Sequence, residues 1–462
     1  MNNDHLPFLE AWDTCAARAA TQLSPRAVEA ARRSWFDTAA AMAAGGHENC
    51  TRAAFQSCAV EPDALGAGDA ALVLGTASHA LDYDDVCMLA TCHPSAPVVA
   101  TLMAILPLVE RARPETSYGQ LLAAYALGTE TMLRLGQWLG FRHYTLGFHA
   151  TSTLGAIGSA ASAARMLGLT SAQAHDALAI AASSASGLRA NFGSDTKPLH
   201  VGFATAAGVR AATLARSGAR GCDDVWGPTG FPFSFSGGEM PPPLAWTGTL
   251  PWALESPGFE HKRFPSCYMT HRLIAGVLAI RARQPQRQGE PVLIDVELPK
   301  GGTAPLKYPR PHTGLQAKFS GPYCAAEAWT RGRVDLASFS DTAVLRTHVA
   351  AEMERVIVRE RDATGETLDT APVLVTVSGS GWSDSVTVDW APGSFADPMS
   401  REELLTKWHD CAAHGGMQSG EALALALLDG PLDTPVAAAV APLRAALLDA
   451  ITTSASTQFA AR

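Results

Sequence analysis

Two side chains that can move a proton or bind an anion stand at expected helix starts, His149 and Lys197. Hydroxyl residues at 151–153 follow His149 and can cap the opening amides of a helix. Pro198, a residue favoured at the first helical position, follows Lys197. Helix N-termini attract anions, so the two residues indicate a pocket for a carboxylate or phosphate. Taken singly, each also fits a satisfied buried histidine or a surface lysine.

Other segments carry charged or reactive side chains in similar positions. They are the run with Asp82, Asp85 and His93, the pair Lys262 and Arg263, and the basic loop 307–312, which contains Tyr308. If these segments meet, lysine, arginine and histidine side chains outnumber carboxylates. Such a pocket suits a di- or tricarboxylate, with arginine as a bidentate contact and lysine as a point charge.

The same residue types suit proton abstraction next to a carboxylate. A neutral histidine has its pKa near the working pH, and lysines crowded by other cations have lowered pKa values. Positive groups would stabilise the enediolate-like charge that develops on the substrate. A protein that binds polycarboxylates without turning them over is the alternative that the same residues allow.

Other chemistries have weaker support. The chain has no GxSxG motif, and no GxGxxG follows a strand, which disfavours a serine nucleophile and a dinucleotide site. Cys267 with His271 one turn on could be a thiol pair, but the pairing could be accidental. The carboxylates between Asp82 and Asp85 could bind Mg²⁺, but they look more like a helix end that orients histidine or lysine. The residues therefore favour neither a metal site nor a dinucleotide cofactor.

Composition narrows the class of protein. The 462 residues are 47% apolar and 17% charged, which predicts a large interior and two or three domains. A net charge of −9 without a basic stripe argues against a nucleic-acid partner. Nine scattered cysteines fit a reduced, cytoplasmic protein. The apolar run from Ala96 to Leu108 contains two prolines and is too short to span a bilayer of about 30 Å, so no membrane partner is expected.

The sequence pattern changes along the chain from mainly helical to mixed helix and strand. Up to about residue 255 the patterns are helical, and the Ala-, Gly- and Ser-rich helices between 151 and 215 favour an all-α layer. Beyond it, alternating valines at 373–377 and strand-like runs at 291–298 and 385–390 predict an α+β unit with helices on one side. After Asp397 the pattern returns to helix, with Ser400 as cap and Glu403 at the capping-box position.

Six motifs in order resemble the MmgE/PrpD family, which includes 2-methylcitrate dehydratase, cis-aconitate decarboxylase and iminodisuccinate epimerase. They read HALDYDD with HPSAPVVA, GFHATSTLGAIGSAASAARMLGL, NFGSDTKPLHVGFATAAGVRAATLARSGARG, KRFPSCYMTH, KFSGPYCAA and APGSFADPMSREELLTKW. The resemblance covers nearly the whole chain. It implies a mainly α fold with a large helical domain from both chain ends (1–259 and 396–462) and an inserted α+β lid (260–395). It also implies a homodimer, a site in the cleft between domains, and catalysis without a cofactor.

The resemblance also carries site residues over by position. His149, Lys197 and Lys262 match basic residues of the decarboxylase site, and Asp82, His93 and Tyr308 match its remaining polar residues. Because the segment from Asp82 to His93 has a one-residue length difference, Asp84 or Asp85 could take the part of Asp82.

Several positions depart from the decarboxylase pattern. Val86 replaces a hydroxyl residue, Cys267 replaces a histidine, and Ala150 replaces a common proline, which argues against faithful cis-aconitate decarboxylation. Tyr144 and Tyr268 lie in segments that look more like the epimerase branch, where one of them could face Lys197 or His149 across the substrate. With Arg263 and Cys267 they complete the expected substrate contacts. We therefore expect a lyase of the dehydratase type acting on a small polycarboxylate, with an epimerase as the alternative.

Overall fold

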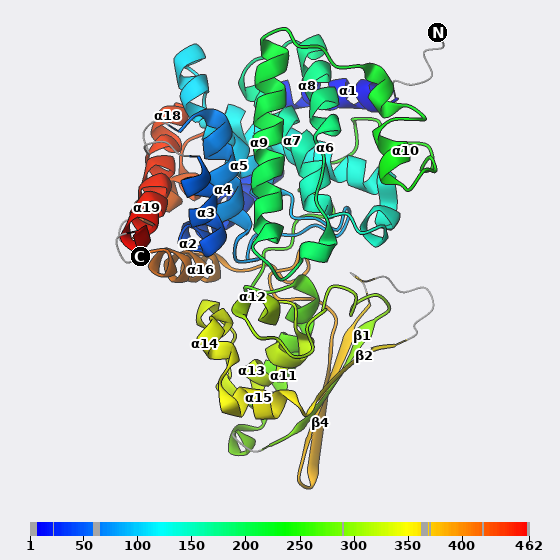
Figure 1. The fold of residues 1–462 in the computed structure, drawn as a ribbon, viewed down its shortest axis with the longest axis vertical. Coiled ribbons are helices and arrows are strands. Elements are labelled where there is room, and N and C mark those ends of the chain that lie inside the picture. The colour runs from blue at the N-terminus through cyan, green and yellow to red at the C-terminus, as the bar shows by residue number, and fades with distance from the viewer. Residues whose placement is uncertain are drawn as a thin grey trace. The chain divides into compact units, whose positions relative to one another are not determined.

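The computed structural model describes residues 7–21, 23–58, 65–288, 291–361, 368, 371–417 and 420–459. Within these ranges the chain forms two compact units (Figure 1). The larger unit comprises the described residues of Met1–Ala190, Thr196–Phe259 and Leu405–Arg462. The smaller unit comprises Asn191–Asp195 and the described residues of Glu260–Leu404.

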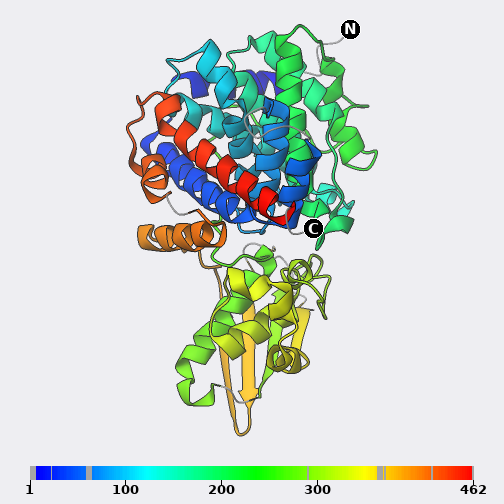
Figure 2. The same cartoon turned by 60° about the vertical axis from the view of Figure 1, so that its left-hand side comes forward.

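The larger unit is built from helices. They are α1 (Pro7–Thr21), α2 (Pro25–Gly45), α3 (Asn49–Ser57), α4 (Ala67–His79), α5 (Ser95–Ala112), α6 (Tyr118–Thr145), α7 (Ala150–Met166), α8 (Ser171–Ser183), α9 (Thr196–Arg216), α10 (Phe231–Phe235), most of α16 (Arg401–His414), α17 (Glu421–Asp429), α18 (Val436–Ala439) and α19 (Ala441–Phe459). Figure 2 shows α19, in red, alongside the N-terminal helices in blue, and it contacts both α2 and α3. The N-terminal helices α2 and α3 and the C-terminal helix α19 therefore pack into one helical core.

Small residues allow the central helices to approach closely, as the sequence predicted. Helix α9 packs against α4 and α7, and α7 also packs against α6. A Cβ atom on Gly158 of α7 would lie 2.8 Å from the carbonyl oxygen of Gly128 in α6, and the converse contact has the same length. Any larger residue at either position would force the two backbones apart.

Two helices continue through residues that usually interrupt a helix. Helix α6 runs to Thr145 with a kink at Gly140, whose φ is +65°. Helix α5 runs through Pro107 to Ala112. Among the described residues α5 is the one helix long and apolar enough to cross a membrane, but 72% of it is buried inside the protein, as in a core helix.

The smaller unit combines helices with one four-stranded sheet. Its helices are α11 (His271–Arg283), α12 (Gly314–Ala317), α13 (Gly321–Arg331), α14 (Asp341–Val344) and α15 (Thr347–Met353), and its strands are β1 (Leu293–Pro299), β2 (Val356–Arg361), β3 (Val373–Gly379) and β4 (Trp382–Val388). The strand order is β2-β1-β3-β4, with β1 parallel to β2 and the other pairs antiparallel. Helices cover one face of this sheet (Figure 1).

The alternating valines of β3 point into the core of the smaller unit, as their period predicted. Val373, Val375 and Val377 are fully buried and pack with Ile274 of α11 and Trp329 of α13. The strand β2 was missed by the sequence patterns, because it lies at the sheet edge and half of its residues are exposed. The mainly α fold class is confirmed, and the lid role of the smaller unit stays a prediction.

The expected capping box at the start of α16 is confirmed. The Ser400 N–H donates to Glu403 Oε2 at 2.8 Å, and the Glu403 N–H donates to Ser400 Oγ at 3.2 Å. This reciprocal pair satisfies two amides that the first turn of a helix leaves without partners.

Candidate functional site

A buried polar cluster forms in the larger unit where helix α4 ends and helices α5, α7 and α9 begin. We define it as His79, Asp82, Asp84, His93, His149, Lys197 and His200, all of which are buried. His79 is the last residue of α4, and the loop after it carries both aspartates and His93 before α5 begins. His149 directly precedes α7, while Lys197 and His200 lie in the first turn and a half of α9.

Asp82 joins a lysine and a histidine that are distant in sequence. Lys197 Nζ lies 2.9 Å from Asp82 Oδ1, and His93 Nε2 lies 3.5 Å from the same oxygen. The φ of Asp82 is +53°, in the left-handed region that non-glycine residues seldom adopt. Such backbone strain persists where surrounding contacts over-determine it and is frequent at functional sites.

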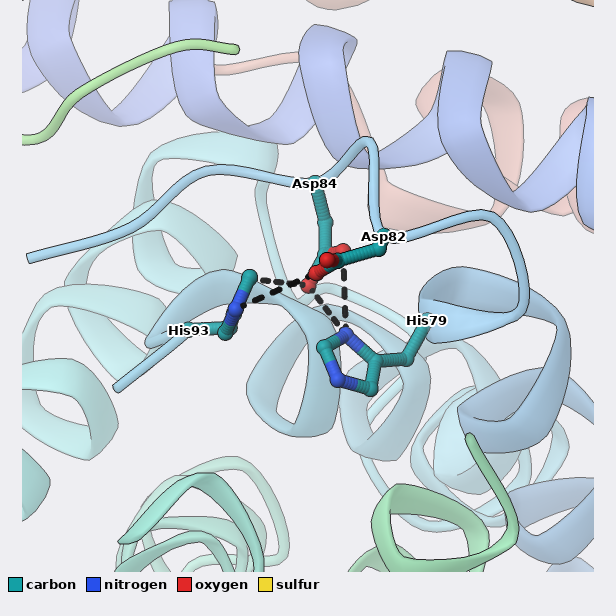
Figure 3. A group of neighbouring side chains, drawn as sticks. All are labelled: His79, Asp82, Asp84 and His93. Atoms are coloured by element: carbon teal, nitrogen blue, oxygen red, sulfur yellow. Dashed lines mark hydrogen bonds and ion pairs between the residues drawn. The ribbon is translucent and has the colours of Figure 1, made fainter. Parts of the chain in front are cut away.

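Asp84 joins two imidazoles (Figure 3). His79 Nδ1 lies 2.8 Å from Asp84 Oδ2, and His93 Nδ1 lies 3.1 Å from it. Burial alone would raise the pKa of the Asp84 carboxyl. The interactions with His79 and His93 outweigh burial and hold its pKa well below the usual range. Asp84 is therefore an ionised acceptor of hydrogen bonds.

Three imidazoles of the cluster, those of His79, His149 and His200, are neutral at physiological pH. Burial, followed by the charge of Lys197, lowers the pKa of His149 well below its ordinary value and that of His200 to about 4. Burial also lowers the pKa of His79 to about 3. The sequence had predicted a histidine titrating near the working pH, and this is wrong for His149 because water is excluded from it and an ammonium group is close.

The hydroxyl groups expected to cap α7 make other hydrogen bonds instead. Thr151 Oγ1 accepts from the His93 N–H at 3.1 Å, and Ser152 Oγ donates to the His200 carbonyl oxygen at 3.0 Å. His149 occupies the cap position, and its N–H donates to the Gly187 carbonyl at 3.0 Å. The predicted capping role is thus wrong, because these hydroxyls connect α7 to the segments that carry His93 and His200.

His149 and His200 contact each other directly. Their Nδ1 atoms are 3.1 Å apart, so in this pair of neutral imidazoles the N–H of one ring donates a hydrogen bond to the bare Nδ1 of the other. The His149 ring also stacks on His79, with ring centroids 5.6 Å apart. Sequence reasoning missed His79 and His200. A signal existed for His200, because it lies three residues after Lys197 on the same helix face.

Asp85, which the sequence allowed as a substitute for Asp82, lies in a separate hydrogen-bond network. Its carboxyl accepts from the Ser95 N–H at 3.2 Å and from Ser95 Oγ, which also contacts the Tyr125 hydroxyl at 2.6 Å. Burial is the largest effect on this group and raises its pKa to about 8. Asp85 therefore binds the start of α5 as a mostly protonated carboxyl at neutral pH.

Replacing Asp85 with asparagine is expected to flatten the dependence of stability on pH. With a folded pKa of about 8 against 3.8 for the ordinary group, the folded protein keeps a proton that the unfolded chain releases. The free energy of unfolding of the wild type therefore falls as the pH rises from about 4 to about 8. D85N lacks this titration and should gain on the wild type over that window. Urea unfolding at about pH 5 and about pH 8 measures the difference, and a pH-independent difference would contradict the assignment.

The remaining predicted site residues are placed as follows. In the larger unit, the Tyr144 ring lies 3.7 Å from the Arg189 guanidinium. In the smaller unit, Lys262 is buried, and the Arg263 guanidinium lies 3.5 Å from the Glu403 carboxylate. The Cys267 N–H donates to the Lys318 carbonyl. The Tyr268 hydroxyl donates to the Glu260 carboxylate at 2.8 Å, and the Tyr308 hydroxyl donates to the Phe192 carbonyl at 2.8 Å. Of the ten predicted residues, the structure brings Asp82, His93, His149 and Lys197 together.

The cluster also has atoms that could coordinate a cation. One ligand atom from each of His79, Asp82, Asp84 and His93 lies within 4.8 Å of the others. The ammonium group of Lys197 already neutralises Asp82, and His79 Nδ1 is hydrogen-bonded to Asp84. We therefore regard Lys197 as the cation of this cluster, and the expected absence of a metal stays a prediction.

The chain matches the models of both domains of one protein family and is similar to two curated enzymes. The model of the MmgE/PrpD N-terminal domain matches residues 13–243, and that of the MmgE/PrpD C-terminal domain matches residues 264–433. Cis-aconitate decarboxylase of Homo sapiens is 29% identical over 350 residues, which are 73% of this chain and 71% of that protein. The Mus musculus enzyme of the same name is 30% identical over 349 residues, with coverages of 73% and 70%.

Proposed function

The chain belongs to the MmgE/PrpD family and is an enzyme of the lyase type, and from this premise we propose that it is a cofactor-independent dehydratase of the 2-methylcitrate dehydratase kind. It removes a proton next to a carboxylate of a small polycarboxylate. The observation that carries the proposal is the buried Lys197–Asp82–His93 arrangement beside the neutral His149.

The chemistry of the cluster supports each step of a dehydration. A neutral imidazole such as His149 accepts the proton from the carbon next to the carboxylate. The ammonium of Lys197 stabilises the negative charge that develops on the carboxylate oxygens. The electron pair of the broken C–H bond forms the new double bond as the C–O bond to the hydroxyl breaks. His93 serves as the acid in this proposal: it enters the step as an imidazolium and gives one N–H proton to the departing hydroxide, so the products are an alkene and water.

Decarboxylation is the second candidate, because both similar enzymes are named for decarboxylation of cis-aconitate. Against it stand the departures at Val86 and Cys267 from the pattern of that enzyme. The proposed substrate contacts at Lys262, Arg263, Cys267, Tyr268, Tyr308 and Tyr144 rest on motif resemblance alone. The lid role of residues 260–395, the homodimer and the cytoplasmic location belong to the same proposal.

A panel of polycarboxylates in D₂O tests the proposal. Citrate, 2-methylcitrate, cis-aconitate and an aspartate-derived dicarboxylate are each incubated with the protein and followed by ¹H NMR. We expect loss of water from a hydroxylated tricarboxylate, with deuterium incorporated at the carbon that loses the proton. Release of CO₂ would favour the decarboxylase, and exchange with racemisation alone would favour the epimerase. Binding of every compound without exchange or turnover would contradict an enzymatic role.

A further inference from the structure

We infer that Gly193 is a positioning residue for Tyr308, because the side chain that Gly193 lacks leaves the space in which the Tyr308 ring lies. The inference rests on the proposed function, since it takes Tyr308 as a contact of the substrate. It gives a role to a residue outside the predicted site residues. Both residues belong to the smaller unit.

Gly193 lies in a tight turn formed by residues 191–194. The Asn191 carbonyl accepts from the Ser194 N–H at 3.2 Å and from Ser194 Oγ at 2.8 Å, which closes the turn. The φ of Gly193 is +86°, in the left-handed region, and the third residue of a type II turn requires such a value. The backbone conformation therefore already favours glycine at this position.

The turn packs directly against the Tyr308 side chain. A Cβ atom on Gly193 would lie 2.4 Å from Tyr308 Cε2, 2.6 Å from its hydroxyl oxygen and 2.7 Å from its Cζ. These distances are shorter than van der Waals contact, so any larger residue must displace either the ring or the turn. Glycine is thus needed here for space as well as for backbone conformation.

Hydrogen bonds and ring contacts hold Tyr308 and the turn together. The Tyr308 hydroxyl donates to the Phe192 carbonyl at 2.8 Å, and the Tyr308 N–H donates to the Phe319 carbonyl at 3.3 Å. The rings of Phe192 and Phe319 lie 5.6 Å apart between centroids, and both are buried. Because Phe192 takes the hydroxyl proton of Tyr308, the hydroxyl oxygen serves a substrate as an acceptor. That suits the hydroxyl group of the proposed substrate.

When a side chain is added at Gly193, we expect the Tyr308 ring to move and the turn to keep its place. The buried ring of Phe192 fixes the turn, and the chain then continues directly into α9, whose second residue is Lys197. The Tyr308 side chain is only partly buried, so its ring can rotate away from the turn. G193A should therefore displace a substrate contact and leave Lys197 in position.

Kinetics of the full-length protein test this role, on the hydroxylated tricarboxylate of the D₂O panel that the wild type turns over. For G193A we expect KM to rise about tenfold and kcat to stay within about threefold, because substrate binding is weakened and the proton-transferring groups are not moved. A loss of folded protein would instead lower the apparent kcat and leave KM unchanged.

G218A is the matched control for the backbone conformation. The φ of Gly218 is +96°, but no atom of the described residues, chain neighbours aside, lies within 4 Å of an added Cβ. Alanine is therefore strained at position 218 as it is at position 193, but it meets no aromatic ring. Both kcat and KM of G218A should stay within about twofold of the wild type.

Two double-mutant cycles separate the Tyr308 contact from other effects of G193A. Y308F lacks the hydroxyl, so its KM is already raised, and G193A should raise it by less than about a further twofold. Y308A lacks the ring. The urea midpoint, which G193A should lower more than G218A does, should therefore lose this extra shift when G193A is combined with Y308A.

Four results would overturn the inference. They are an unchanged KM in G193A, a fall in kcat without a rise in KM, additive effects of G193A and Y308F on KM, and an extra urea shift that persists in the Y308A background. If the wild type turned over no polycarboxylate, the proposed function would fail, and the urea cycle would still decide whether Gly193 makes room for Tyr308.

Discussion

Replacing Lys197 with methionine is expected to lower kcat/KM on the true substrate by about 10³-fold or more. Methionine preserves much of the side-chain length but removes the ammonium that lies 2.9 Å from Asp82. The developing charge of the transition state would then lack its stabilising cation. Turnover measured by ¹H NMR in D₂O checks this result, and a rate within about tenfold of the wild type would contradict the assignment.

The same substitution has a structural consequence that must be separated from the catalytic one. Asp82 would stay buried but lose the ammonium of Lys197, and breaking a buried pair in this way costs about 3–5 kcal/mol of folding free energy. The double variant D82N/K197M removes both charges and should recover most of that stability. Its turnover should stay as low as that of K197M, because stability alone does not restore the ammonium. Recovery of turnover in the double variant would show that the single variant failed by unfolding.

Replacing Lys407 with methionine is expected to cost about 3–5 kcal/mol of folding free energy at neutral pH. Lys407 on α16 lies 2.6 Å from Asp37 Oδ1 of α2 and 2.7 Å from the carbonyl oxygen of Tyr83, and both charged side chains are buried. Tyr83 lies between Asp82 and Asp84 in sequence. The pair therefore joins the C-terminal part of the chain to α2 and to the loop that carries the cluster.

The loss in K407M should shrink at low pH. Burial is the largest effect on Asp37 and raises its pKa above the ordinary value. As the pH falls, Asp37 therefore takes up a proton in the folded protein at a higher pH than in the unfolded chain. A protonated Asp37 needs no counter-ion, which makes the variant relatively more stable in acid than at pH 8. Urea unfolding at several pH values measures this trend. D37N/K407M is the control and should recover most of the stability at neutral pH, and an equal loss in single and double variants would contradict the role of the charge pair.

The exposed ion pair between Arg310 and Glu354 serves as a comparison for the buried one. Its atoms lie 2.8 Å apart, but both side chains are largely exposed. Solvent screens such pairs and their contribution to stability is small. R310M should therefore unfold at the same urea concentration as the wild type.

Part of the site could be predicted because helix boundaries can be recognised from the sequence. His149 and Lys197 were selected from the hydroxyl residues and the proline that follow them, and both lie at helix starts in the structure. Their convergence with Asp82 could not follow from spacing, since 115 residues separate Asp82 from Lys197. The motif resemblance supplied what spacing could not, and the two domain models confirm the family.

Other predictions failed because they concerned interactions between distant segments. The hydroxyls at 151–153 were expected to bind their own helix, but Thr151 and Ser152 bond to the segments of His93 and His200. The pKa of His149 was expected near neutral pH, but burial and Lys197 lower it well below that. The edge strand β2 has too few buried side chains for a clear alternating pattern.

The amino-acid sequence by itself determined the mainly α class, the MmgE/PrpD family and the presence of proton-transferring residues at helix ends. Those properties follow from local periodicity, capping residues and motifs, which are complete within short stretches of the chain. Only the tertiary structure decided that Lys197 pairs with Asp82, that Asp84 holds two imidazoles, and that His149 is neutral. These depend on distances between remote groups and on the exclusion of water, which arise only when the helices have packed together.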